Sequence, residues 1–201
     1  MALEWIDNII DKNILQDNLT FVSLYIAVYE HMTDYVVSTL KTFLCDFGIK
    51  NGKEYYSETE VYKKEIKNRI VDNKGNKNIV KSSFLWLIDN NAITKTDYQH
   101  FLDAKLLRNK YAHELTSVIY QGTNESDIKM FVCMIELYKK ITKWFFVNFE
   151  APIMGDDLPD DVDLTGVQTV ANVMFDMMLE VLYNGKSEEY KNILNEVKSG
   201  Q

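Results

Sequence analysis

Residues 14–46 read ILQDNLTFVSLYIAVYEHMTDYVVSTLKTFLCD, and apolar side chains recur in this stretch at steps of three and four residues. The members of this apolar stripe include Leu15, Leu19, Val22, Ile26 and Tyr29. Such spacing is typical of an amphipathic helix. It predicts one long helix, which Gly48 and the Asn51-Gly52 pair end because glycine and asparagine favour turns.

The absence of proline extends this prediction to most of the chain. The 201 residues contain only Pro152 and Pro159, so residues 1–151 can form long uninterrupted helices. A chain of this length can also bury a substantial core. The sequence therefore predicts an all-α fold.

Further helices are expected on both sides of a loop at residues 72–76. A helix starting near Thr96, capped by Thr94 or Thr96, is followed by a turn at Gly122. The predicted helices after the first are 57–71, 79–89, 96–120, 126–149, 165–184 and a short one after Gly185. We expect a helical bundle over residues 1–150, an acidic, proline-containing loop over 151–164, and C-terminal helices over 165–201 that pack on the bundle.

Composition excludes several classes of protein. Hydrophobic residues make up 46% and charged residues 26%, which is typical of a folded globular chain. No apolar run reaches the ~20 residues of a membrane span, and the acidic N-terminus does not resemble an export signal. Cys45 and Cys133 form no zinc or redox motif, and the three histidines lack metal-site spacing. We expect a cytoplasmic protein with no metal, no cofactor and no membrane contact.

The net charge of −8 argues against non-specific coating of nucleic acid, which depends on many cationic contacts to phosphates. A locally basic cluster nevertheless occurs at Lys105, Arg108 and Lys110. If the protein binds RNA, the sequence therefore favours recognition of a particular RNA feature over non-specific binding to any RNA.

The candidate site lies in residues 106–115, LLRNKYAHEL. Arg108 can hold a phosphate through two parallel hydrogen bonds. His113 can accept and donate a proton near neutrality, and Asn109 is spaced to hydrogen-bond it or a substrate oxygen. These groups suffice for metal-free RNA cleavage.

The helix that carries these residues has two apolar faces. At ~100° per residue, Leu102 and Leu106 share a stripe with His113, while Leu107, Tyr111 and Leu115 lie near the opposite side. We expect the second face to pack inward. The first face would then meet its own copy in a homodimer, which brings two Arg108 and two His113 into one cleft.

Arg108-Asn109-Lys110-Tyr111-Ala112-His113 matches the R-x(4–6)-H signature, and residues 14–149 resemble the HEPN superfamily. The resemblance implies a HEPN-like helical bundle and a dimeric, metal-independent endoribonuclease of the toxin or phage-defence type. Arg108, Asn109 and His113 would be its catalytic residues, supported by Glu30, Lys105 and Lys110. An antitoxin or another regulatory protein is a further implied partner. Leu115 departs from the tyrosine that many antitoxin-paired members carry two residues after the histidine.

Alternatives remain at this point. Many HEPN domains are non-catalytic interaction modules, and a nucleotide-binding sensor could use Arg108 and Lys105 to hold a phosphate. Glu30 lies midway along the first long helix, where it could orient Arg108 or simply be an exposed glutamate.

Overall fold

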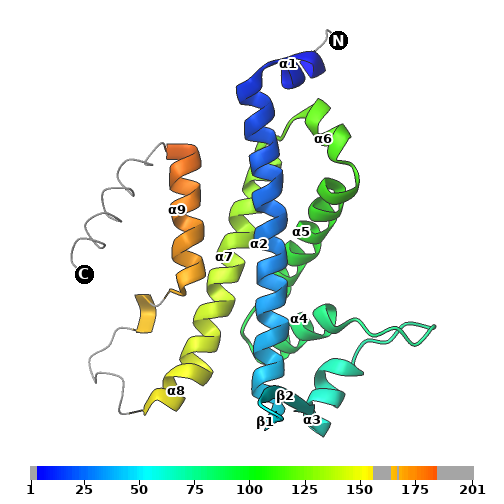
Figure 1. The fold of residues 1–201 in the computed structure, drawn as a ribbon, viewed down its shortest axis with the longest axis vertical. Helices are drawn as coiled ribbons and strands as arrows, with labels where there is room; N and C mark the ends of the chain where they lie inside the picture. The colour runs from blue at the N-terminus through cyan, green and yellow to red at the C-terminus, as the bar shows by residue number, and fades with distance from the viewer. Residues whose placement is uncertain (1–3, 156–163, 167, 185–201) are drawn as a thin grey trace. The chain divides into compact units, whose positions relative to one another are not determined.

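The computed structural model of this chain describes residues 4–155, 164–166 and 168–184. The described part is predominantly helical and contains one two-stranded sheet (Figure 1). The helical character of the predicted fold is therefore confirmed. The chain divides into two compact units, Met1–Leu137 and Tyr138–Gln201.

The first unit begins with α1 and the long helix α2, followed by a hairpin and a series of helices. Its elements are α1 (Glu4–Ile10), α2 (Lys12–Leu44), β1 (Cys45–Lys50), β2 (Lys53–Glu58), α3 (Glu60–Tyr62), the π-turn η1 (Lys63–Lys67), α4 (Ile79–Asp89), α5 (Lys95–His113), α6 (Leu115–Gln121) and the start of α7 (Glu125–Phe145). The predicted helices 14–46 and 79–89 correspond to α2 and α4. None of the described helices combines the length and apolar character that a membrane crossing needs.

Helix α2 forms because its N-terminus is capped and one of its sides is apolar. Asp11 Oδ1 accepts hydrogen bonds from the backbone N–H of Asn13 (2.8 Å) and Ile14 (3.2 Å), which satisfies two donors that the helix leaves free. The buried apolar residues of α2 are Phe21, Val22, Tyr25, Val28, Tyr29, Met32, Val36 and Leu40. Burying this side holds α2 against its neighbours.

Aromatic pairs join α2 to α5 and to the first part of α7. Tyr25 meets Tyr111 edge to face at 5.2 Å between ring centroids, and Phe21 meets Phe131 at 5.4 Å. Tyr29 stacks on Phe101 at 5.8 Å. Such pairs add to the burial of apolar area and help to align these three helices.

The hairpin corrects the prediction that Gly48 and Asn51-Gly52 simply end a helix. Strands β1 and β2 pair antiparallel from Cys45↔Glu58 to Lys50↔Lys53, and Asn51 (φ 52°) and Gly52 (φ 72°) form the turn between them. Both positive φ angles suit a type I′ turn, for which Asn-Gly is the preferred pair. The helix predicted at 57–71 is wrong at both ends, because β2 occupies its start and the helical turns stop at Lys67.

A second correction concerns the helix predicted at 96–120. It ends at His113, and Glu114 (φ −123°, ψ 31°) separates α5 from α6. Helix α6 lies against α1, where Asn8 Nδ2 donates to the carbonyl of Tyr120 at 2.7 Å, and it buries Val118. This tertiary contact accompanies a change in chain direction between α5 and α6.

The second unit contains the end of α7, η2 (Phe146–Glu150), α8 (Ala151–Met154), η4 (Leu164–Gly166) and α9 (Val170–Asn184). Asn172 Nδ2 donates to Thr142 Oγ1 at 2.9 Å, and Lys139 pairs with Asp176 at 2.7 Å, so α9 packs on the end of α7. The predicted loop at 151–164 is wrong at its start, because Pro152 sits in the first turn of α8, where proline is tolerated. Residues 156–163 of that loop, and the helix expected after Gly185, lie outside the described residues.

Candidate functional site

The structure brings Glu30, Arg108 and Asn109 together on adjacent faces of α2 and α5. Arg108 Nη2 donates to Glu30 Oε1 at 2.5 Å, and Nη1 donates to Asn109 Oδ1 at 3.3 Å. The Arg108 side chain is 27% exposed and that of Glu30 51% exposed, so the pair lies at the surface with the arginine more enclosed. The guanidinium is thus oriented from two sides.

The alignment of α2 and α5 explains why these groups meet. The Tyr29–Phe101 stack and the hydrogen bond from Tyr25 Oη to the carbonyl of Ala104 (3.2 Å) tie the helices together beside the ion pair. Burial raises the pKa of Tyr29 to about 12, against the opposing effect of the nearby Arg108 charge. Tyr29 therefore stays neutral at physiological pH, and Glu30 is the group that pairs with the charge of Arg108.

Arg108 retains donors for a ligand. A guanidinium carries five N–H groups, and the two bonds above use only part of them. The Nε atom is buried without a hydrogen-bond partner among the described residues, so solvent does not reach it. A bound phosphate would therefore meet the remaining Nη hydrogens.

His113 is exposed at the last position of α5. His113 lies five positions after Arg108, which corresponds to about 7.5 Å along the helix and about 140° around it. The helix therefore directs the two side chains to different sides of one chain. Asn109, which was expected to hydrogen-bond His113 or a substrate oxygen, accepts a hydrogen bond from Arg108.

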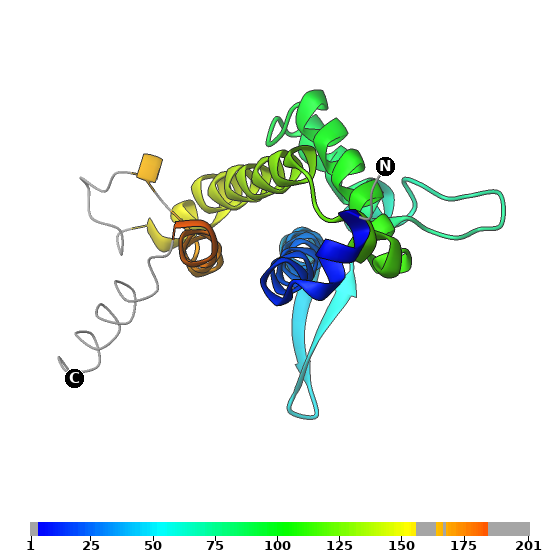
Figure 2. The same cartoon turned by 90° about the horizontal axis from the view of Figure 1, so that it is seen from above.

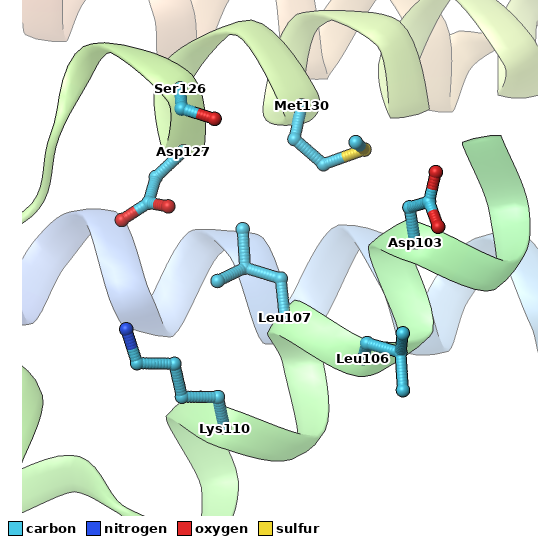
Figure 3. A pocket seen from close by; sticks show the side chains of 7 residues that line it. All are labelled: Asp103, Leu106, Leu107, Lys110, Ser126, Asp127 and Met130. Carbon is cyan, nitrogen blue, oxygen red and sulfur yellow. The ribbon is translucent and has the colours of Figure 1, made fainter.

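A pocket of about 340 Å³ lies beside the motif (Figure 3). Figure 3 shows the Lys110 ammonium extending toward the first turn of α7. The lining residues are Asp103, Leu106, Leu107, Lys110, Ser126, Asp127 and Met130. Its walls thus combine three apolar side chains with two carboxylates, one lysine and one serine.

Most of the pocket lining was missed by the sequence interpretation. Ser126 and Asp127 were read only as the start of a helix, and Asp127 does have that role, since its N–H donates to Asn124 Oδ1 at 3.1 Å. The carboxylate of Asp127 is also buried at the pocket wall. The turn at Gly122 is the signal in the sequence that could have indicated this position of Asp127, because it brings the start of α7 back alongside α5.

The two faces predicted for the motif helix are only partly observed. Tyr111 is buried as expected, but Leu115 is 40% exposed, because it begins α6 rather than continuing α5. Leu106 is 69% exposed and His113 is exposed, whereas Leu102 is half-buried, so the face expected to meet a second copy is open only toward its C-terminal end. Lys105 is half-buried on the same helix.

Among the described residues, no cluster of three or more histidine, cysteine or carboxylate side chains is arranged to hold a metal ion. Comparison of the chain with family models, with curated proteins and with solved structures gives no match. The geometry around Arg108 and His113 is therefore what indicates a function.

Proposed function

We propose that this protein is a HEPN-type, metal-independent endoribonuclease whose site forms between two copies of the chain. The observation that carries the proposal is the Arg108 guanidinium, held by Glu30 and Asn109 on the helix that ends in the exposed His113. A fixed cation for a phosphate and a titratable ring one and a half turns away match the needs of phosphodiester cleavage.

The reaction is an attack by a ribose 2′-hydroxyl on its adjacent phosphorus. One His113 removes the proton of that hydroxyl, and the bond from phosphorus to the 5′-oxygen breaks. The second His113 donates a proton to the leaving oxygen. Arg108 stabilises the negative charge that develops on the phosphate. The products are a 2′,3′-cyclic phosphate and a 5′-hydroxyl.

The geometry of α5 favours a site shared by two copies. The ~140° between Arg108 and His113 makes it hard for both side chains of one helix to reach the same phosphate. The uncovered face with Leu106 lies on the side of His113 and offers apolar area to an identical face. A two-fold axis there would supply both histidines to one cleft.

The test is cleavage of tRNA and total RNA in EDTA by the wild type and two variants. Because acid–base groups typically contribute about 100- to 10,000-fold, we expect Arg108→Ala and His113→Ala each to lose at least about 100-fold. Lys129→Ala is the matched control, since Lys129 lies on exposed α7 surface and pairs with Glu125. Cleavage that persists in either site variant would exclude this mechanism.

A non-catalytic interaction module is the alternative, and the 69% exposure of Leu106 is the observation that favours it. Such a module would assemble through the same face without cutting RNA. Under that function Leu106→Glu abolishes association through this face, whereas no RNA is cleaved by any form of the protein.

A further inference from the structure

The hairpin β1–β2 carries exposed apolar side chains that the proposed site does not use. Figure 2 shows the hairpin extending from the end of α2 as an arm. Phe47 is 56% exposed and Ile49 is 67% exposed, and both lie on the same face of β1 because alternate residues share a face. In the described part of the chain no third strand pairs with the hairpin. A two-stranded sheet alone is marginally stable in water.

The outer edge of β1 is able to form further backbone hydrogen bonds. In a hairpin closed by a two-residue turn, the pair next to the turn, here Lys50↔Lys53, is hydrogen-bonded and the pairs then alternate. Phe47 and Ile49 therefore direct their N–H and C=O groups away from β2. The N–H of Cys45 is already used, since it donates to the carbonyl of Lys41 at the end of α2. The free edge is thus centred on Gly48.

We propose that β1 pairs antiparallel with β1 of a second copy, about a two-fold axis at Gly48, to give a four-stranded sheet. This register joins the backbone groups of Phe47 to those of Ile49 in the other copy, so the outward-facing groups of both strands are satisfied. It is an isologous contact, in which the same surface serves both copies.

Charge complementarity identifies a second copy as the occupant. The two-fold register sets Asp46 opposite Lys50 of the second copy, and the reverse pair forms on the other side of the axis. It also sets Phe47 opposite Ile49, an aromatic and β-branched pair of the kind that stabilises sheets. Within one hairpin Lys50 lies opposite Lys53, a like-charge pair that the Asp46 of a second copy would relieve. Registers centred on Phe47 or Ile49 create no such opposite-charge pair.

Gly48 is suited to lie at the axis. The ring of Tyr55 covers it so closely that a Cβ on residue 48 would lie 2.6 Å from that ring. The absence of a side chain leaves the centre of the edge unobstructed, while Tyr55 covers one side of the strand.

The edge of β2 lacks this self-complementarity. Its outward-facing residues are Glu54, Tyr56 and Glu58 by the same alternation. Two-fold pairing about Tyr56 would set Glu54 opposite Glu58, a repulsive pair, and pairing about Tyr55 creates no opposite charges. Glu58 is in addition paired with Lys67 of its own chain. The self-association surface is therefore β1.

This surface is separate from Arg108 and His113 and does not depend on the proposed function. Together with a dimer at the motif face, it would build assemblies larger than a dimer, because each chain would then carry two isologous contacts.

Charge exchange tests the proposal through the mass in solution, measured by light scattering on the full chain. Asp46→Lys alone and Lys50→Asp alone each create like-charge pairs across the axis, so each should have at most about half the mass of the wild type. An equimolar mixture of the two variants recreates opposite charges at both pairs. That mixture, and the double variant, should regain the wild-type mass.

The matched control is Glu54→Lys, which reverses a charge on the same hairpin but on the other strand, and should leave the mass unchanged. Circular dichroism of each variant checks that the helices are intact. Single variants that keep the wild-type mass, or a mixture that stays at the mass of its separate components, would overturn the proposal.

Discussion

The ion pair between Arg108 and Glu30 orients the guanidinium more than it stabilises the fold. The pair is only half-enclosed, and exposed salt bridges contribute roughly 0–1 kcal/mol, so its value for stability is small. Its effect on orientation is larger, since it holds a guanidinium that Asn109 contacts from the other side. We therefore interpret Glu30 as a positioning residue for Arg108.

Glu30→Gln should lower kcat for RNA cleavage by about 10-fold with little change in KM, because a misplaced guanidinium stabilises the transition state less well. Glu30→Asp should recover part of the loss. The free energy of unfolding, from urea titration, should change by less than about 1 kcal/mol. A large loss of stability with unchanged kcat would contradict the positioning role.

At the scale of elements, the start of α5 determines where the motif helix begins. Thr94 Oγ1 accepts from the N–H of Asp97 at 3.1 Å, and the N–H of Thr94 donates to Asp97 Oδ2 at 2.7 Å, which is a reciprocal capping box. The sequence left Thr94 and Thr96 as equal candidates for this cap. The structure decides for Thr94, and Thr96 lies exposed in the first turn.

Thr94→Ala should reduce the free energy of unfolding by about 1 kcal/mol, because the cap of α5 is lost. Urea denaturation followed by circular dichroism measures the change. Thr96→Ala is the matched control, with an expected change within about 0.5 kcal/mol, since its side chain caps nothing. Equal losses in both variants would mean that the cap is not the source of the effect.

At the scale of the whole molecule, the local charge of the motif is opposite in sign to the net charge of the chain. The net charge is −8, yet Lys105, Arg108 and Lys110 lie within two turns of α5. Under the proposed function, RNA would be held through few phosphates, and the remaining surface would repel it.

Binding of single-stranded RNA to the His113→Ala protein, which the proposed function makes inactive, should show a shallow salt dependence. Three cations from each of one or two copies predict a slope of log K against log salt of about −2 to −4. Lys110→Ala should reduce its magnitude by about 0.7 for each copy engaged, whereas Lys129→Ala should not. Fluorescence anisotropy over a salt series gives the slope, and a value steeper than about −6 would refute a small basic site.

Local patterns in the amino-acid chain were enough to predict the main helices. The apolar stripe and the lack of proline predict α2 and α4 nearly to the residue, because helix formation depends on neighbours three and four positions away. The candidate residues of the motif were also identified from their spacing in the sequence alone. The Asn51-Gly52 turn was a local signal for the hairpin that was interpreted as a helix end instead.

Only the tertiary structure decided which of these residues meet. Glu30 and Arg108 are 78 positions apart, and their contact depends on the packing of Tyr25 and Tyr29 against α5. The break at Glu114 likewise follows from the contact of α6 with α1, which no pattern in residues 96–120 contains. Long-range burial selects among conformations that are locally similar in free energy, so the site geometry is a property of the packed chain.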